Sequence, residues 1–433
     1  MRHTMTRRTF ARSGAAAVGL AAAVGTRALG ANDRIRLGFI GVGNRGQQLQ
    51  RAFLAHDDAQ AVVFCDAFEP YLERARQNND GKGETCIDFR KVLERKAVDA
   101  VVVATPDHWH AIQTVDACEA GKDVYVEKPL SITIHEGRRM VAAARRTQRV
   151  VQVGLHRRAS SLYARLAEQA QGGAFGKITV ARAYRLSNMF PKGIGKAPEA
   201  DPPKGLHWDL WLGPRPKRPF KATIAPYKFR WWPLYSSQVA NWGVHYIDAI
   251  RWVTGELAPV SISAHGGRFA VDDDREIPDT MEAIFEFASG RLLIFGQYEA
   301  SGNRALRSGE IELRGTQGTL YVSSRAYEVV PERGGQFQDR KPRMEPARVE
   351  EKSSAHDLGV GHARDFLDCI RSRKRPRADV EVGHRSTTFA LLANIALATR
   401  SRIEWDPKAE RITSPAAANA LLHYAYRKPW VLR

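Results

Sequence analysis

Apolar and polar residues follow two alternating rhythms in the first part of the chain after residue 31. Short apolar runs, such as 34–40, 61–65 and 97–105, are separated by segments in which apolar residues recur every three or four positions. The runs are typical of strands buried on both faces, and the second rhythm is that of amphipathic helices. This alternation predicts an α/β Rossmann domain over residues 32–155, a parallel sheet with helices on both faces.

Local signals mark the helices and the last strand of this domain. Thr133 and Glu136 form a capping box at the start of a helix that should end at Thr147. Other helices are expected over 47–56, from Asp88, and over 107–122, and the closing strand over 149–154.

The remaining residues, 156–433, show a different pattern. Period-two alternation over 259–269, 280–299 and 309–323 predicts a largely antiparallel open sheet, with a further strand expected over 177–186. Helices are expected over 162–170, 241–255, 356–370 and 384–399. The stretch 187–233 holds nine of the 21 prolines and four tryptophans, so we expect a long ordered loop. The result is an α+β substrate-binding and oligomerisation domain, whose open sheet favours a homo-oligomer.

A glycine-rich segment follows the first predicted strand. Gly41, Gly43 and Gly46 have the spacing G-x-G-x-x-G, enclose Asn44 and Arg45, and lead into a helix. In a dinucleotide site such glycines permit a tight turn, close approach of a pyrophosphate and close packing of helix on strand, and the helix N–H groups face the anion. The alternative is a glycine-rich turn that binds nothing.

Asp66 ends the second strand, 20 residues after Gly46. A carboxylate at this place accepts hydrogen bonds from the adenosine ribose hydroxyls and repels a 2′-phosphate. The predicted cofactor is therefore NAD, with NADP less favoured.

Residues 1–31 have the composition of an export signal. Arg7 and Arg8 precede Phe10, a weakly apolar stretch follows, and small residues lie at 28–30. This pattern resembles a twin-arginine signal peptide and predicts use of the twin-arginine export machinery and a periplasmic or otherwise exported protein. The alternative is a basic tail followed by an Ala-rich helix. No later segment has the length and hydrophobicity of a membrane span.

The formal net charge is +19, and five basic residues but no acidic ones precede Asn32. No basic run is interleaved with aromatic residues in a nucleic-acid motif, and the densest cluster, 371–377, has the pattern of a solvated loop. We therefore predict no nucleic-acid partner. The four cysteines lack metal-binding spacing, so no metal site is expected.

Four motifs occur in a fixed order: GFIGVGNRG at 38–46, ATPDHWH at 104–110, VEKP at 126–129 and NWGVHYID at 241–248. Together they resemble the glucose-fructose oxidoreductase, inositol dehydrogenase and rhizopine catabolism (Gfo/Idh/MocA) family over nearly the whole chain. The resemblance implies that the lysine of E-K-P, Lys128, lies in the active site. It also implies that Thr105, Pro106, His110 and Glu127 flank the nicotinamide and its ribose.

Lys128 and His245 are the predicted catalytic residues. Lys128 ends a strand at the carboxyl edge of the sheet, where its cation can stabilise a forming alkoxide or, once desolvated, act as a base. His245 suits proton exchange with a hydroxyl. Asn241, His245 and Asp248 are spaced to share one helix face, so Asp248 could orient the imidazole. Many members of the family that the chain resembles have Asp where this chain has Asn241.

Further substrate contacts are expected from His156, Arg157, Tyr184 and Trp231 or Trp232, although the tryptophans could equally lie in a core or an interface. The predicted function is NAD-dependent oxidation of a hydroxyl on a sugar, polyol or cyclitol, with a cofactor that is either retained or exchanged. Two alternatives are a glycosidase or lyase working by transient sugar oxidation and a non-catalytic sugar-binding protein.

Overall fold

The computed structural model describes residues 34–237, 239–352 and 355–433, and the predicted signal peptide lies outside them. The first domain contains a sheet of six parallel strands in the order β3-β2-β1-β4-β5-β6, the strand order of a dinucleotide-binding Rossmann domain. The strands are β1 Ile35–Ile40, β2 Ala59–Cys65, β3 Glu84–Cys86, β4 Ala100–Val103, β5 Asp123–Val126 and β6 Val151–Val153.

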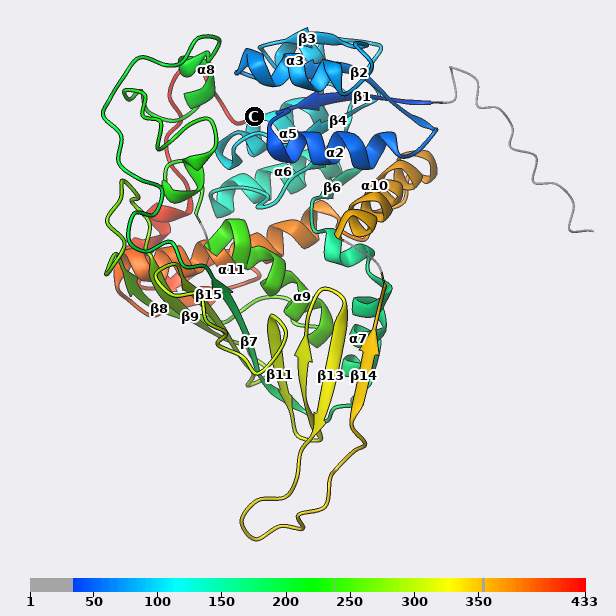
Figure 1. Ribbon diagram of the computed structural model, residues 1–433, viewed down its shortest axis with the longest axis vertical. Helices are drawn as coiled ribbons and strands as arrows, with labels where there is room; N and C mark the ends of the chain where they lie inside the picture. The colour runs from blue at the N-terminus through cyan, green and yellow to red at the C-terminus, as the bar shows by residue number, and fades with distance from the viewer. Residues whose placement is uncertain (1–33, 238, 353–354) are drawn as a thin grey trace, which may run out of the picture. The chain divides into compact units, whose positions relative to one another are not determined.

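Helices cover both faces of this sheet, as the alternating pattern predicts (Figure 1). They are α2 Asn44–Leu54, α3 Glu69–Gln77, α4 Arg90–Leu93, α5 His110–Glu119 and α6 Ile134–Arg146. The capping box at the start of α6 is present, because the Thr133 hydroxyl accepts from the Glu136 N–H and the Glu136 carboxylate accepts from the Thr133 N–H. The predicted α/β fold of this domain is confirmed.

The second sheet has ten strands in the order β14-β13-β12-β11-β7-β10-β9-β8-β15-β16. Only β7 and β10 pair in parallel, so the sheet is largely antiparallel, as predicted. Its strands are β7 Ile178–Leu186, β8 Ser261–Gly267, β9 Thr280–Glu286, β10 Leu292–Tyr298, β11 Ile311–Gly315, β12 Gly318–Val322, β13 Ala326–Pro331, β14 Ala347–Glu350, β15 Ile403–Asp406 and β16 Arg411–Ser414.

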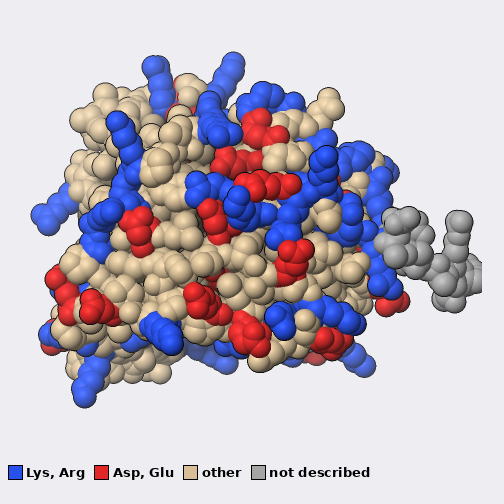
Figure 2. Space-filling model, turned by 90° about the horizontal axis from the view of Figure 1, so that it is seen from above, with Lys and Arg blue, Asp and Glu red and all other residues tan. Residues whose placement is uncertain are grey.

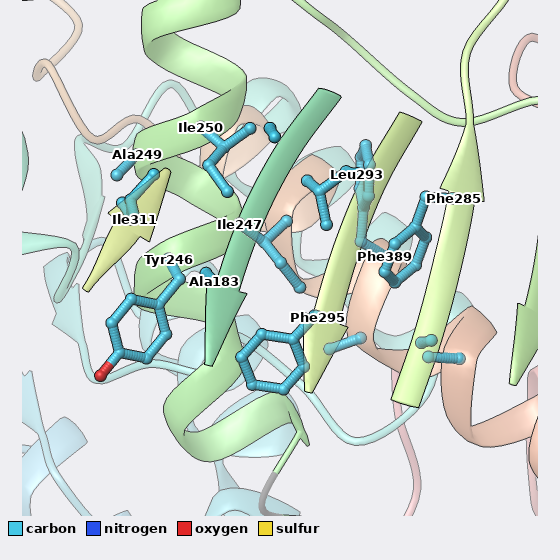
Figure 3. Close-up of a cluster of buried hydrophobic side chains, with 14 of the residues drawn as sticks. Ala183, Tyr246, Ile247, Ala249, Ile250, Phe285, Leu293, Phe295, Ile311 and Phe389 are labelled. Atoms are coloured by element: carbon cyan, nitrogen blue, oxygen red, sulfur yellow. The ribbon is translucent and has the colours of Figure 1, made fainter. Parts of the chain in front are cut away.

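Helix α9, Val244–Thr254, packs lengthwise on one face of the second sheet (Figure 3). Its Ile247 and Ile250 meet Ala183 of β7 and Phe295 of β10 in one buried cluster. Burying an isoleucine side chain contributes about 1.5–3 kcal/mol, so this contact holds the N-terminal end of α9 firmly in place. The small side chain of Ala183 leaves room for the helix. Four further helices are α7 Ser161–Gln171, α8 Trp208–Leu212, α10 Ala355–Ser372 and α11 Val380–Thr399.

Two C-terminal segments pack on the first domain. Phe366 of α10 lies edge-on to Phe53 of α2 and to Tyr125 of β5. Near the chain end, Trp430 packs against Trp109 and Phe89 at the start of α5 and before α4. The chain from α10 onward thus helps to complete the core of the N-terminal domain as well as that of the second sheet.

The proline-rich stretch 187–233 is ordered and has its own hydrophobic cluster. Trp211 stacks on Trp208 and lies edge-on to Phe229, and Trp232 is buried in the same cluster. Backbone hydrogen bonds join the loop to the connection after β2: the His207 N–H donates to the Ala67 carbonyl. The loop therefore covers the end of the first sheet that carries the glycine motif (Figure 1).

The surface carries both signs of charge. On the face seen in Figure 2, Lys and Arg side chains are interspersed with Asp and Glu and do not form a single basic stripe. Among the described residues, no helix is long and apolar enough to cross a bilayer.

Candidate functional site

A cavity of about 580 Å³ opens at the carboxyl ends of β1, β4 and β5. Residues that directly follow these strands form one wall, and the second domain forms the other. This sheet edge is where doubly wound sheets bind ligands. The residues predicted for the site that line the cavity are Gly41, Gly43, Asn44, Arg45, Asp66, Thr105, Pro106, His110, Glu127, Lys128, His156, Trp231, Asn241 and His245.

The three glycines of the motif have different tasks. Gly41 has φ +85°, and a Cβ there would lie 2.5 Å from the Thr105 nitrogen. A Cβ on Gly46 would lie 2.1 Å from the Gly41 carbonyl oxygen, so Gly46 serves helix packing and does not line the cavity. A Cβ on Gly43 would meet only the Tyr71 ring, at 3.0 Å, and Gly43 faces the cavity. A side chain at Gly43 would therefore occupy the space of a ligand, whereas a side chain at Gly41 or Gly46 would disturb the packing of the protein itself.

The N-terminus of α2 faces the same space. Its N-cap residue Gly43 makes no side-chain capping bond, and the first turn contains no acidic residue. Asn44 and Arg45 of this turn line the cavity. Free N–H groups at a helix N-terminus attract anions, and the residues present therefore fit the pyrophosphate of a dinucleotide.

Asp66 lies at the other side of the glycine turn. Its carboxylate accepts hydrogen bonds from the N–H groups of Val42, at 2.8 Å, and Phe68, at 2.9 Å. Burial raises the pKa of Asp66 to about 6, against the effect of these two bonds. The carboxylate is thus fixed at the end of β2 with its remaining lone pairs available for ribose hydroxyls.

The strand ends next to the predicted nicotinamide position are tied together. The two ring nitrogens of His110 lie 2.8 Å from the Pro129 carbonyl and 3.0 Å from the Thr105 carbonyl. The Thr105 hydroxyl donates to Gln113, and Pro106 lines the cavity beside it. His110 therefore positions the ends of β4 and β5 relative to one another.

Glu127 forms an ion pair with Arg45 across the sheet edge. The Arg45 Nε lies 2.7 Å from a Glu127 carboxylate oxygen, and Glu127 is 4% exposed. A Cβ on Gly154 would lie 2.6 Å from the same carboxylate, so Gly154 makes room for it. The Lys128 N–H also donates to Glu127, which fixes the backbone that carries the predicted catalytic lysine.

The Lys128 side chain points across the cavity to the start of the α9 segment. Its Nζ donates to the Asn241 carbonyl at 2.7 Å and lies 3.4 Å from the Asn241 side-chain oxygen. Burial lowers the pKa of Lys128 to about 8, and the charges of Glu127 and Asp107 oppose that shift. The ammonium retains donor capacity toward a ligand, because it has three hydrogens and one strong acceptor.

His245 and His156 lie side by side, with ring centroids 5.1 Å apart. Burial, followed by the charge of Lys128, lowers the pKa of His245 well below its usual value. Burial also lowers the pKa of His156. Both imidazoles are therefore neutral at physiological pH, and a neutral imidazole can accept a proton from a substrate hydroxyl.

A π-helical turn, Val239–Gly243, precedes α9 and contains Asn241. Asn241 and His245 both line the cavity, but Asp248 does not share their face. The Asp248 carboxylate pairs with Arg158 at 2.8 Å and accepts from the Ser386 hydroxyl at 2.7 Å. These partners hold Asp248 in the protein interior, where it makes no hydrogen bond to His245 among the described residues.

The remaining residues predicted to contact the substrate differ in their position relative to the cavity. Arg157 is buried away from the cavity, where it pairs with Glu310 and Tyr163. Tyr184 lies on the open face of the second sheet against Tyr298. Of the two tryptophans, Trp231 lines the cavity and donates to Glu299, whereas Trp232 is buried in the loop cluster.

The cavity also contains charged residues to which the sequence assigned no role, namely Asp107 within the ATPDHWH motif and Arg185, Arg230 and Glu299 outside the four motifs. Arg185 follows Ala181 and Ala183 at period two on β7, so the strand alternation would have placed it on the helix-covered face. Among the described residues, no group of three or more His, Cys, Asp or Glu side chains is arranged to hold a metal ion.

Three family models match the chain in order. An oxidoreductase-family NAD-binding Rossmann fold matches residues 35–155, a GFO/IDH/MocA C-terminal domain matches 211–321, and an oxidoreductase-family C-terminal alpha/beta domain matches 337–432. Glycosyl hydrolase family 109 protein 1 of Shewanella sp. strain MR-4 is 32% identical over 125 residues, which are 27% of each chain. The chain thus spans about a quarter of the length of the curated relatives it matches.

Solved structures of similar fold include a levoglucosan dehydrogenase in complex with NADH and levoglucosan, with a TM-score of 0.65 at 18% identity. The WlbA dehydrogenase from Bordetella pertussis, in complex with NADH and UDP-GlcNAcA, has a TM-score of 0.62 at 19% identity. The aldose-aldose oxidoreductase from Caulobacter crescentus has a TM-score of 0.64 at 16% identity. Each match covers 86% of this chain and 99% of the other. With the NAD-binding domain and both C-terminal domains matched in order, this chain belongs to the Gfo/Idh/MocA family of oxidoreductases.

Proposed function

We propose that this protein oxidises a hydroxyl group of a sugar, polyol or cyclitol, with NAD as the hydride acceptor. The observation that carries the proposal is the meeting of Lys128 and His245 in one cavity with the glycine loop and Asp66. The substrates in the printed titles of the similar structures, levoglucosan and UDP-GlcNAcA, agree with a carbohydrate hydroxyl.

Gly43, the first turn of α2 and Asp66 would hold NAD, which accepts a hydride from carbon when bound. His245, kept neutral by burial, is the base that receives the hydroxyl proton at an imidazole nitrogen. Lys128 donates a hydrogen bond to the same substrate oxygen and stabilises the negative charge that develops there. The bond from Nζ to the Asn241 carbonyl orients the ammonium for this task.

The test measures NADH formation at 340 nm with a panel of sugars, polyols and cyclitols, using the wild type, Lys128→Met and His245→Gln. We expect NADH with at least one compound and strongly reduced rates in both variants, with NAD affinity preserved. Cleavage of a glycoside without net NADH would instead support the transient-oxidation alternative. Sugar binding with no turnover of any kind would support the non-catalytic alternative.

We also propose that the protein is exported through the twin-arginine route and keeps its cofactor between turnovers. The Arg7-Arg8 pair supports export. The contact between the 187–233 loop and the connection after β2 supports retention, because Phe68 and Tyr71 of that region line the cavity. Native mass spectrometry after a desalting column measures whether NAD stays bound. The periplasmic yield of the Arg7→Lys/Arg8→Lys variant, compared with that of the wild type, measures export. Loss of NAD on the column would contradict retention of the cofactor. An unchanged periplasmic yield of the variant would contradict the proposed twin-arginine signal peptide.

The open face of the second sheet supports a homo-oligomer. Tyr184, Tyr298 and the 43% exposed Ile284 lie on this face. Light scattering of the purified protein should give at least twice the chain mass, and an Ile284→Asp variant should be smaller. A monomeric wild type would rule the proposal out.

A further inference from the structure

The substrate side of the cavity holds a cation, Arg185, that forms no ion pair with a carboxylate of the described residues. Arg185 projects from β7 into the cavity, beyond the small side chains of Ala181 and Ala183 on the same face of the strand. Its guanidinium carbon lies 3.8 Å from the centroid of the Trp242 ring, so the guanidinium lies over the indole, and it also hydrogen-bonds with the Tyr246 hydroxyl. A guanidinium has five N–H donors, so a single contact to Tyr246 leaves donors for a ligand.

Arg185 lacks the carboxylate partner that several other buried or partly buried arginines have. Its Nε is buried and has no hydrogen-bond partner, and no carboxylate among the described residues forms an ion pair with it. Arg157, Arg158 and Arg275, by contrast, pair with Glu310, Asp248 and Asp273. A buried N–H donor without an acceptor is costly, so an acceptor from outside the chain is expected at the Nε, and an anion suits the charge of the guanidinium.

The carboxylates that line the cavity are engaged elsewhere. Glu127 pairs with Arg45, and Glu299 accepts from Arg275 at 2.6 Å and from Trp231. Asp107 accepts from the Ser236 hydroxyl. Asp66 lies at the ribose end, bound to the N–H groups of the glycine turn and of Phe68. These engagements leave Arg185 without an ion-paired acid among the described residues of the cavity, and the charge of Glu299 acts on it from a longer distance.

Arg185 is close to the predicted reacting groups. Lys128 Nζ lies 5.8 Å from the centroid of the Trp242 ring on which Arg185 stacks, and both cations line one cavity. Asn241 and His245 belong to the same segment as Trp242. A single monosaccharide could therefore contact Arg185 at one end and Lys128 and His245 at the other.

We propose that the substrate is an acidic sugar whose carboxylate is bound by the Arg185 guanidinium, so that uronates or aldonates are preferred over neutral sugars. This inference rests on the proposed oxidation of a sugar hydroxyl and names the substrate class. The fork of one arginine can bind a carboxylate or a phosphate in two parallel hydrogen bonds, but a single guanidinium balances the charge of a carboxylate and not the charge of about −1.5 to −2 on a phosphate monoester. Arg185 is a residue that determines specificity, and the proton and hydride steps belong to other groups.

The experiment measures binding by calorimetry to the full protein saturated with NADH, in which oxidation cannot proceed. The probes are D-glucuronate, D-glucuronamide and D-glucose, the matching galactose series, D-gluconate and D-glucose 6-phosphate. We expect at least one acid to bind about tenfold or more tightly than its neutral counterparts. Arg185→Gln should abolish that preference while changing neutral-sugar affinity less than about twofold, and Arg185→Lys should retain part of it.

Arg182→Gln is the matched control, because Arg182 lies on the same strand and pairs with Glu312 instead of facing the cavity. It should leave the preference intact. The proposal fails if no acid in the panel binds, if amides bind as well as acids, if sugar phosphates bind more tightly, or if Arg185→Gln weakens both classes equally. A preserved acid preference without NAD reduction would leave this inference standing and refute the proposed oxidation. NAD reduction by neutral sugars alone would refute this inference and leave the proposed oxidation standing.

Discussion

The two walls of the cavity are built from chain segments of very different kinds. The cofactor wall uses the ends of neighbouring parallel strands, and its groups lie in short motifs directly after β1, β2, β4 and β5. The substrate wall collects single residues from β7, from the covering loop, from the π-helical turn and from the end of β10. One wall is specified by local sequence, and the other by how distant segments pack.

This difference has a physical cause. In a parallel sheet the carboxyl ends of all strands meet at one edge, so residues in that position converge without further information. In the second domain, whether a residue faces the cavity depends on strand parity, on the register of β7 with β10 and on where α9 settles on the sheet. We expect a substitution in the cofactor wall to impair either NAD binding or folding, depending on the residue. Substitutions in the substrate wall should act on turnover and specificity.

The largest effect is expected at Lys128, where the two walls meet. Lys128→Met should lower turnover by about 10²- to 10⁴-fold, because it removes the charge that stabilises the developing oxyanion. NAD affinity should change little, because Lys128 donates to Asn241 rather than to the glycine loop. Steady-state kinetics and calorimetry with NAD measure the two quantities. A parallel loss of NAD affinity would mean that the lysine belongs to the cofactor wall alone.

The second test distinguishes a glycine needed for binding from one needed for folding. Gly43→Ala should weaken NAD binding by roughly 10- to 100-fold, because the added Cβ would overlap the bound group and such overpacking costs about 1–3 kcal/mol. The free protein should fold normally, because Gly43 has φ −67° and the added Cβ meets only the edge of the Tyr71 ring, at 3.0 Å.

Gly46→Ala is the matched variant for that test. Its Cβ would collide with the Gly41 carbonyl, so soluble yield and melting temperature should fall before any binding is measured. Equal melting temperatures for the two variants would show that the motif glycines do not divide the work in this way.

The sequence could predict most of the first domain but less of the substrate wall. The glycine motif, Asp66 and the E-K-P strand end are local signals, and all of them lie where the pattern indicates. The position of Asp248 could not be predicted from local spacing. Its partners Arg158 and Ser386 lie 90 and 138 positions away in the sequence, and they hold the carboxylate in the interior. The π-helical turn was not predicted either, because its residues have no distinctive composition.

Tyr184 and Arg185 show that strand parity matters more than residue type. The aromatic residue is a plausible sugar contact by chemistry, but it lies on the open face, and the next residue reaches the cavity. The buried alanines at 181 and 183 mark the covered face and so point to Arg185. The packing of helix α10 on α2 of the first domain could likewise not be predicted from the sequence pattern, and only the folded structure shows it.

A smaller effect is expected for cofactor choice. Asp66→Ser should weaken NAD binding about tenfold, since the serine hydroxyl replaces one of the two hydrogen bonds to the ribose and loss of the other costs about 1.5 kcal/mol. NADP binding should weaken less or improve, because the carboxylate no longer repels the 2′-phosphate. Affinities of both cofactors for both proteins provide the measurement. An unchanged ratio would mean that Asp66 only caps the N–H groups of Val42 and Phe68.

The smallest effect concerns the pH dependence at the junction of the two walls. Burial lowers the pKa of Lys128 to about 8, so the ammonium is charged at pH 7 and increasingly neutral above pH 8. Because the pKa of His245 lies well below its usual value, that imidazole is already neutral at pH 7 and stays so as the pH rises. If the lysine acts as a cation and the histidine as the base, kcat/KM for oxidation should fall about fourfold between pH 7 and 8.5. If the lysine were the base, the same range would show a rise. Lys128→Arg separates the two, because a guanidinium stays charged: its residual activity should be flat over this range, whereas a fall parallel to that of the wild type would assign the titration to another group.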